Sequence, residues 1–127
     1  MEWIFRGDQP IYSQLVQRIK QGIVSGELSP GSRLPSVRDL ATEAGVNPNT
    51  MQRALQELER EGMVFSQRTS GRFVTEDVML IGRAKRAFAS EHIRVFREGM
   101  EKLGYGREEM LVLLREEKEE TDGDSGM

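Results

Sequence analysis

Several kinds of residue and pattern are missing from this chain of 127 residues, and each absence excludes a class of protein. There is no cysteine, which excludes disulfides and thiolate metal sites and is compatible with a reducing cytoplasm. The single histidine, His92, has no second histidine with which to share a metal ion, and we expect neither a metal nor another cofactor. No apolar run approaches the roughly 20 residues of a membrane span, and the amino terminus lacks the apolar core of a signal peptide. We therefore expect a cytoplasmic protein with no membrane partner.

Sequence motifs of enzymes are also missing. The chain has no GxSxG, no phosphate-binding P-loop, no HExxH and no cysteine nucleophile. Paired glutamates do occur, at Glu108-Glu109 and Glu116-Glu117, but they fall in a helical pattern and are typical of a solvated face. We expect no catalytic residue, and the chain is not predicted to be an enzyme.

An excess of positive charge, the usual sign of indiscriminate nucleic-acid binding, is absent as well. The net charge is −3, and residues 1–77 carry nine Lys/Arg against ten Asp/Glu. Placement matters more than the total, because Glu57, Glu59 and Glu61 fall late in a predicted helix. The arginines lie at the start of that helix, in the turn before it, or on a predicted hairpin: Arg33, Arg38, Arg53, Arg68 and Arg72. A local basic face on a neutral domain would bind selectively.

The most informative pattern lies in residues 34–74, where each joint carries its own start or stop residue. Ser36 and Asp39 form a capping box for a short helix, and Gly45 supplies a left-handed turn that ends it. Asn47 then caps a second helix whose first residue is Pro48. Two short alternating runs, 63–66 and 72–75, predict a hairpin. This order predicts a helix-turn-helix followed by a wing, which lays one helix into the major groove of DNA.

The flanking segments complete the predicted fold. Pro10 opens a helix that ends at Ser25-Gly26, and further helical patterns cover 82–103 and 107 to about 119. Residues from about 119 to 127 are rich in Gly, Asp and Ser, and we expect them to be disordered. The predicted fold is mainly α with a small β-hairpin wing. It combines a winged helix-turn-helix DNA-binding domain, 1–77, with a short α-helical C-terminal dimerisation domain, 78–127.

Candidate DNA-binding residues follow from how such a domain docks. The first turns of the second helix reach base edges, where Asn and Gln suit adenine and Arg suits guanine. The outward residues there are Asn47, Asn49, Thr50, Gln52 and Arg53. Ser36 and Arg38 suit the sugar-phosphate backbone, and Arg68 and Arg72 flank the small residues of the wing tip, Gly71 among them. Each set has a structural alternative: Asn47 as a cap alone, and the others as solvated surface.

An apolar stripe on the long C-terminal helix is the second candidate site. Its members are Phe88, Val95, Phe96, Met100 and Leu103. It could be core, a ligand pocket or a partner surface. A helix of about 22 residues spans about 33 Å, more than the cover of a small winged domain needs. The favoured interpretation is that the stripe packs against its copy in a second chain. Such a homodimer would place two recognition helices on successive major-groove faces, about 34 Å apart.

Three segments carry a family resemblance. PIYSQL at 10–15, GELSPGSRLPSVRDLA at 26–41 and VNPNTMQRALQELEREG at 46–62 resemble GntR-type bacterial transcription regulators. The short two-helix tail, with LGYGREEM at 103–110, resembles the YtrA subfamily. The resemblance implies a homodimeric, mostly repressing, operator-binding protein whose reduced C-terminal part serves dimerisation. The family's DNA-contacting sites fall on Ser36, Arg38, Asn47, Asn49, Thr50, Gln52, Arg53 and Gly71.

The chain departs from the family pattern in its wing, where Thr69 and Arg72 stand in place of the usual Gly and Thr. Larger relatives hold effectors in a bigger C-terminal domain, whose residues have no match here. We expect a sequence-specific, DNA-binding transcription regulator, a homodimeric repressor of a palindromic operator. Two alternatives stay open: a winged-helix protein-interaction module, and a sensor that holds an unknown small-molecule effector between the C-terminal helices.

Overall fold

A computed structural model describes the backbone of residues 1–125 and the side chains of residues 1–117. The chain divides into two compact units, Met1–Arg86 and Ala87–Met127. The first unit thus continues beyond the boundary expected after residue 77. Disorder is expected from about residue 119 to 127. The side chains of these residues, and the backbone of 126–127, lie outside the described part of the chain, so this expectation stays a prediction.

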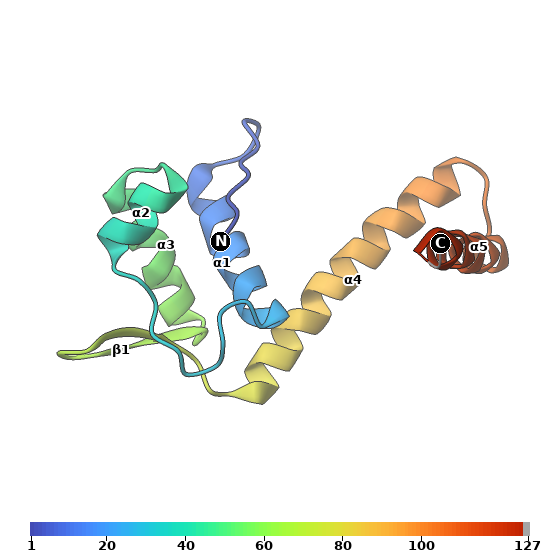
Figure 1. The fold of residues 1–127 in the computed structure, drawn as a ribbon. Helices are drawn as coiled ribbons and strands as arrows, with labels where there is room; N and C mark the ends of the chain where they lie inside the picture. The colour runs from blue at the N-terminus through green and yellow to red at the C-terminus, as the bar shows by residue number, and fades with distance from the viewer. Residues whose placement is uncertain (126–127) are drawn as a thin grey trace. The chain divides into compact units, whose positions relative to one another are not determined.

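Three helices build most of the first unit: α1 (Ile11–Ser25), α2 (Val37–Ala44) and α3 (Pro48–Arg60) (Figure 1). Pro10 is the residue before α1 rather than its first residue, and Gly26 ends α1 in a left-handed conformation with φ 87°. Leu15, Ile19 and Ile23, at every fourth position of α1, are buried, so one face of the helix lies in the core.

The α2–turn–α3 unit follows its capping residues closely. The Ser36 hydroxyl accepts a hydrogen bond from the Asp39 amide at 3.1 Å, as a capping box requires. Gly45, with φ 71°, ends α2, and the side chain of Asn47 accepts from the Asn49 amide at 2.7 Å. Only residues 45–47 separate the two helices, so the predicted helix-turn-helix is confirmed.

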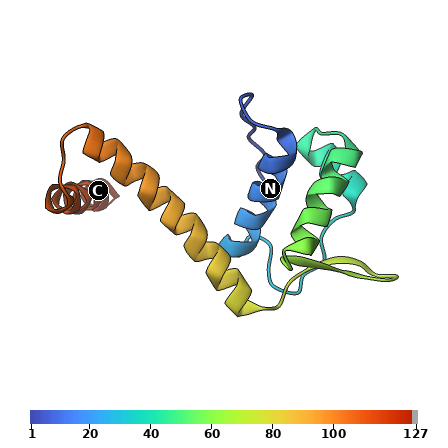
Figure 2. The same cartoon turned by 180° about the vertical axis from the view of Figure 1, so that it is seen from behind.

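The wing is an antiparallel pair, β1 (Val64–Gln67) and β2 (Gly71–Val74). β1 begins one residue later than expected and β2 one residue earlier, and residues 68–70 form the loop between them. Phe65 lies opposite Phe73, with stacked rings 5.7 Å apart between centroids. The tip of the hairpin extends past α2 and α3 in Figure 1 and in Figure 2. The other edge of β2 pairs with the segment before α2, through an isolated bridge from Arg33 to Phe73.

One apolar core holds the helices and the wing together. Its fully buried members come from α1, α3 and the hairpin: Leu15, Ile19, Ile23, Met51, Leu55, Leu58, Met63, Val64 and Val74. Met1, Trp3 and Phe5, from the amino-terminal arm, pack on its margin. Burial of large aliphatic side chains stabilises a fold by about 1.5–3 kcal/mol each before entropy is subtracted, so this core fixes the orientation of α3.

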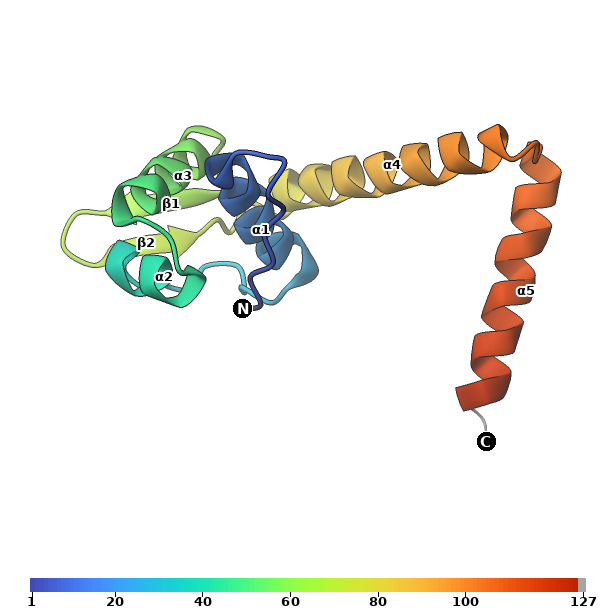
Figure 3. The same ribbon diagram turned by 90° about the horizontal axis from the view of Figure 1, so that it is seen from above.

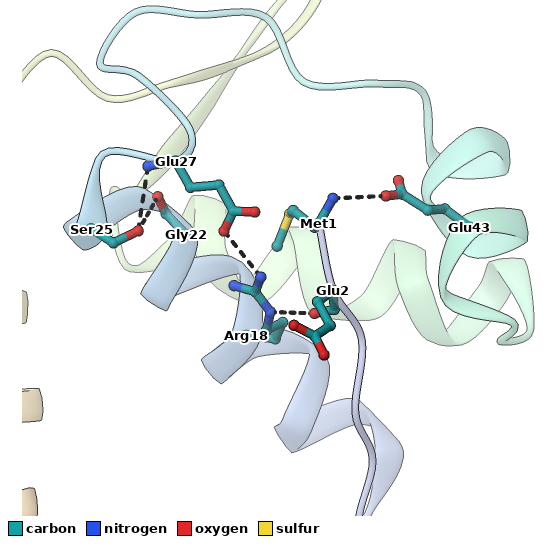
Figure 4. Close-up of polar contacts among 7 residues, drawn as sticks. All are labelled: Met1, Glu2, Arg18, Gly22, Ser25, Glu27 and Glu43. Carbon is teal, nitrogen blue, oxygen red and sulfur yellow. Dashed lines mark hydrogen bonds and ion pairs between the residues drawn. The ribbon is translucent and has the colours of Figure 1, made fainter. Parts of the chain in front are cut away.

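Polar contacts fasten the amino-terminal arm to α1 and α2 (Figure 4). The Met1 ammonium lies 3.1 Å from the Glu43 carboxylate on α2. The Arg18 guanidinium on α1 donates to the backbone carbonyl of Glu2 at 2.6 Å and to Glu27 at 3.0 Å. The arm therefore covers the side of the helices that these residues share.

Helix α4 (Val78–Lys102) begins four residues before the predicted start at Gly82. The reason is Asp77, whose carboxylate accepts from the amides of Met79 and Leu80, each at 3.1 Å, and so caps the helix. Leu80, together with Ile81 and Ala84, packs against the winged core. The first turns of α4 therefore belong to the first unit.

In the second unit, the chain turns sharply between α4 and α5 (Arg107–Ser125) (Figure 3). Gly104 adopts φ 94°, and the Tyr105 amide donates to the Met100 carbonyl at 3.1 Å. The Glu109 carboxylate accepts from the Gly106 amide at 2.9 Å, and Met110 is buried. Within the described part of the chain, none of the helices combines the length and apolar character that crossing a membrane requires.

Candidate nucleic-acid interface

Helix α3 has one face in the core and the opposite face in solvent. Met51, Ala54, Leu55 and Leu58 are buried, with exposed fractions of 0–1%. The exposed positions Asn49, Arg53, Gln56 and Arg60 recur at spacings of three and four residues, which places them in one row along the helix. A polar row of this kind, backed by a rigid core, can enter a groove without rearrangement of the fold.

Arg53 is held in place by an aromatic ring. Its guanidinium carbon lies 4.3 Å from the centre of the Tyr12 ring on α1, within the range of a cation–π contact. The ring restricts the side chain while its N–H donors stay available, because Arg53 is exposed. Tyr12 was not among the predicted site residues, since its position as the second residue of an amphipathic helix gives no local sign of this contact.

A second set of contacts joins α3 to the wing. Arg72 donates from Nε to the Glu59 carboxylate at 2.5 Å and from Nη1 to the side-chain oxygen of Gln52 at 3.2 Å. The Ser66 hydroxyl donates to the same Glu59 oxygen at 2.5 Å. Ser66 and Arg72 face each other across the hairpin, so both strands are tied to the helix. We call these four residues the wing–helix network.

The charge of Glu59 is stabilised within this network. Burial alone would raise the pKa of Glu59, but the hydrogen bonds from Ser66 and Arg72 and the positive charge of Arg72 lower it below its ordinary value. The prediction that this glutamate lies away from the basic positions was therefore wrong in one respect. It is late in α3, as expected, but the wing folds back onto that part of the helix and brings Arg72 to it.

The negative charge of Glu57 is likewise stabilised by an arginine. The Arg60 guanidinium donates to it from Nε at 2.8 Å and forms a second, shorter contact through Nη2. These bonds lower the pKa of Glu57 despite the opposing effect of desolvation. The two glutamates nearest to the row on α3 are thus each paired with an arginine, which reduces their repulsion of a phosphate backbone.

Gly71 has a conformational role in the structure. Its φ is 107°, a backbone conformation that residues with a side chain rarely adopt, and a Cβ added there would lie 3.1 Å from Nε of Arg33. The guanidinium of Arg33 therefore lies close to the wing backbone. Arg33 was noted from the sequence as a basic residue of the turn but was not placed in the predicted site.

The remaining predicted DNA-binding residues lie at the expected ends of their elements. Ser36 and Arg38 are exposed at the start of α2, and Asn47 is exposed at the start of α3, with its side chain engaged as a cap. Thr50 is half-buried, and Arg68 is exposed at the wing tip. The structure thus brings Gln52 and Arg72 together by contact, and Asn49 and Arg53 by their place in one row. Arg38 and Arg68 stand apart from these pairs.

Four members of the predicted dimerisation stripe lie on α4, which has no buried residue along its length, and Leu103 directly follows the helix. Val95, Phe96 and Leu103 are 57%, 37% and 74% exposed, and Phe88 and Met100 are half-buried. A charged face lies on the other side, where Arg94 contacts Glu91 at 2.5 Å and Glu98 at 2.9 Å. The helix is therefore amphipathic, and residues 1–117 leave its apolar face largely exposed.

These features define a winged helix-turn-helix DNA-binding domain. Two helices are joined by a tight turn, the second helix carries an outward polar row, and a hairpin docks on that helix. The model of the family described as "Bacterial regulatory proteins, gntR family" matches residues 11–74, which is half of the chain. The chain belongs to the GntR family, and the predicted resemblance is confirmed.

Two curated relatives from Bacillus subtilis (strain 168) are similar to the chain. The uncharacterized HTH-type transcriptional regulator YhcF is 40% identical over 107 residues, which cover 84% of this chain and 88% of that protein. The HTH-type transcriptional repressor YtrA is 44% identical over 72 residues, 57% of this chain and 55% of that protein. The second match therefore spans about half the length of the repressor.

Solved structures extend the similarity beyond the winged unit. A GntR family transcriptional regulator from Listeria monocytogenes is 37% identical, has a TM-score of 0.81, and is matched over 88% of this chain and 98% of its own. The AraR DNA-binding domain, in complex with operator ORX1, is 28% identical with a TM-score of 0.54, over 59% of this chain and 96% of its own.

Proposed function

We propose that this transcription regulator is a homodimeric repressor that binds a palindromic operator through α3 and the wing. The observation that carries the proposal is the division of α3 between a core face that is fully buried and a polar row that is exposed. That row presents amide and guanidinium groups, which suit the hydrogen-bonding edges of bases in a major groove. AraR, a similar protein, is known in complex with its operator.

In this proposal each group of site residues has a separate task. Asn49, Gln52 and Arg53, in the first turns of α3, contact base edges. Ser36 and Arg38 contact a phosphate at the start of α2, where the free backbone amides of the helix favour an anion. Arg68 approaches phosphates or the minor groove from the wing tip. Asn47 shapes the start of α3 as its cap and places the row at the base edges.

The second copy of the chain is proposed to cover the apolar face of α4. Val95, Phe96 and Leu103 leave large apolar surface in water, which is unfavourable unless a partner covers it. Residues of one face of a single helix can pair with themselves about a two-fold axis, the commonest symmetry of soluble oligomers. Two winged units held in this way would read two halves of a palindrome, spaced by about 34 Å of helix axis.

Repression follows from occupancy of the operator, since a dimer bound across a promoter excludes other proteins from the same groove. The name of one similar protein, the repressor YtrA, supports this direction of regulation. No effector is required for this activity. A small molecule held by the tail helices would alter it by changing how the two copies pair, which a ligand-dependent rise in melting temperature would reveal.

The DNA-binding part is tested by selecting bound duplexes from a random pool and measuring affinity for the winning duplex against salt. We expect a palindromic site and a steep loss of affinity with rising salt, because each neutralised phosphate releases counterions. A protein-interaction module would retain no duplex at low ionic strength, and that result would overturn the proposal.

The dimer is tested with Val95→Asp and a matched control, Ser90→Asp, which adds the same charge to the charged side of the same helix. By light scattering we expect twice the chain mass of 14.4 kDa for the native protein and for Ser90→Asp. Val95→Asp should give 14.4 kDa. A native protein that is monomeric at micromolar concentration and on DNA would contradict this part of the proposal.

A further inference from the structure

The wing–helix network constrains the residue of α3 that lies nearest to the wing. Gln52 and Glu59 are separated by two helical turns and share one side of α3, and Arg72 on β2 contacts both. The Arg72 side chain is 18% exposed and the Glu59 side chain 30% exposed, so the contact is partly shielded from water. The position of Arg72 is therefore set by the hairpin and by Glu59 rather than by Gln52.

The contact decides which end of the Gln52 amide faces outward. An arginine side chain has N–H donors and no acceptor, so the atom of Gln52 that lies 3.2 Å from Nη1 is the amide oxygen. The amide nitrogen, with two N–H donors, then points away from Arg72. A base donor such as adenine N6 that approached the Gln52 oxygen would lie beside the positive charge of Arg72. As held in the free protein, Gln52 and Arg72 together present donors.

Base edges differ in what they accept. Adenine offers N7 as an acceptor and N6 as a donor, so its pairing with a glutamine requires a free amide oxygen. Guanine offers two acceptors, N7 and O6, at the same edge. A surface that presents donors alone matches guanine and does not match adenine.

We infer that Arg72, through its hydrogen bond to the Gln52 oxygen, sets the base preference of α3 at one position per half-site to guanine instead of adenine. The inference rests on the proposed function, since it requires that α3 reads bases. It makes Arg72 a specificity-determining residue that acts through Gln52.

The test is selection of duplexes from a random pool by the full chain, by Arg72→Met and by Arg68→Met. Arg72→Met removes the donors and keeps the apolar stem, and Arg68→Met makes the same change at the exposed tip of the same hairpin. We expect guanine at one position of each half-site for the native chain and for Arg68→Met. For Arg72→Met we expect the preference at that position to shift toward adenine by on the order of ten-fold.

A third variant, Gln52→Met, identifies the position and does not disturb the wing. It should abolish the guanine preference at the position that Arg72→Met converts, and leave the other positions unchanged. An adenine preference there in the native chain would overturn the inference, as would an Arg72→Met variant that loses affinity at every position without a change of base. If circular dichroism shows that Arg72→Met does not fold, Gln52→Met still tests the inference. The position at which Gln52→Met loses its base preference must then be guanine in the site selected by the native chain. Failure of the native chain to enrich any duplex would instead refute the proposed function.

Discussion

Removal of the Arg53 guanidinium should weaken operator binding more than any other single change on the exposed row of α3. A bidentate arginine–guanine contact is worth about 1–3 kcal/mol, or roughly 5- to 150-fold in affinity for one half-site. A symmetric dimer makes the contact twice, so Arg53→Ala should cost about 2–6 kcal/mol on a palindromic duplex. The variant should also lose discrimination at one base pair per half-site, because the other contacts of α3 remain.

The structure divides this effect into two parts. The Tyr12 ring, 4.3 Å from the Arg53 guanidinium, restricts the side chain in the free protein. Tyr12→Leu keeps apolar packing and removes the ring, so it should cost only about 0.5–1 kcal/mol per half-site and leave the base preference intact. In the Arg53→Ala background, Tyr12→Leu should have no further effect on DNA binding, since the partner of the ring is gone.

Fluorescence anisotropy with a labelled operator, at one fixed salt concentration, measures these differences. Arg60→Ala is the matched control, because Arg60 lies two turns further along the same row and is paired with Glu57. It should change affinity far less than Arg53→Ala. If Arg53→Ala binds the operator as tightly as Arg60→Ala does, with unchanged base preference, Arg53 does not contact a base.

Three further predictions concern other parts of the winged unit. Arg38→Ala should weaken binding to all duplexes alike and reduce the slope of log affinity against log salt by about 1, because one phosphate contact is lost; a change of base preference would contradict the phosphate role. The pKa of Glu59 is lowered in the fold, so its contribution to wing docking is fully present above the ordinary value of 4.5 and is lost as pH falls below it. Backbone NMR shifts of Ser66 and Arg72 should report the titration of the Glu59 carboxyl group, and Glu59→Gln should remove this pH dependence. A Glu59 titration at or above pH 4.5 would refute the prediction. Asn47→Ala should lower the free energy of unfolding by about 0.5–2 kcal/mol, measured by urea denaturation, and Asn47→Ser should restore most of it.

Much of the winged unit was predictable from the sequence because its signals are local. A cap such as Ser36 or Asn47 acts on an amide two or three residues away, so short spacings are enough to recognise it. Gly45 and Gly26 end helices through their own backbone conformation. Helix order, the turn and the hairpin follow from such signals without knowledge of the packing.

The contacts that shape the site were not predictable in this way. Arg72 meets Glu59 and Gln52 across 13 and 20 residues of sequence, and only the docked position of the wing brings them together. Arg53 meets Tyr12 for the same kind of reason, since α1 must first pack on α3. Helix α4 starts earlier than predicted because spaced apolar residues indicate a helix only from Gly82, whereas Asp77 caps the helix before a continuous apolar run.

The central claim, that the exposed row of α3 enters a major groove, can be tested by cleavage from a tethered probe. Because the chain has no cysteine, Gln56→Cys provides a unique attachment site for an iron chelate on that row, and Gln21→Cys provides a control on the exposed side of α1. We predict strand cleavage confined to the major groove of each half-site from position 56 and little from position 21. A duplex that is retained but cleaved equally from both positions, or from position 21 alone, would contradict the claim.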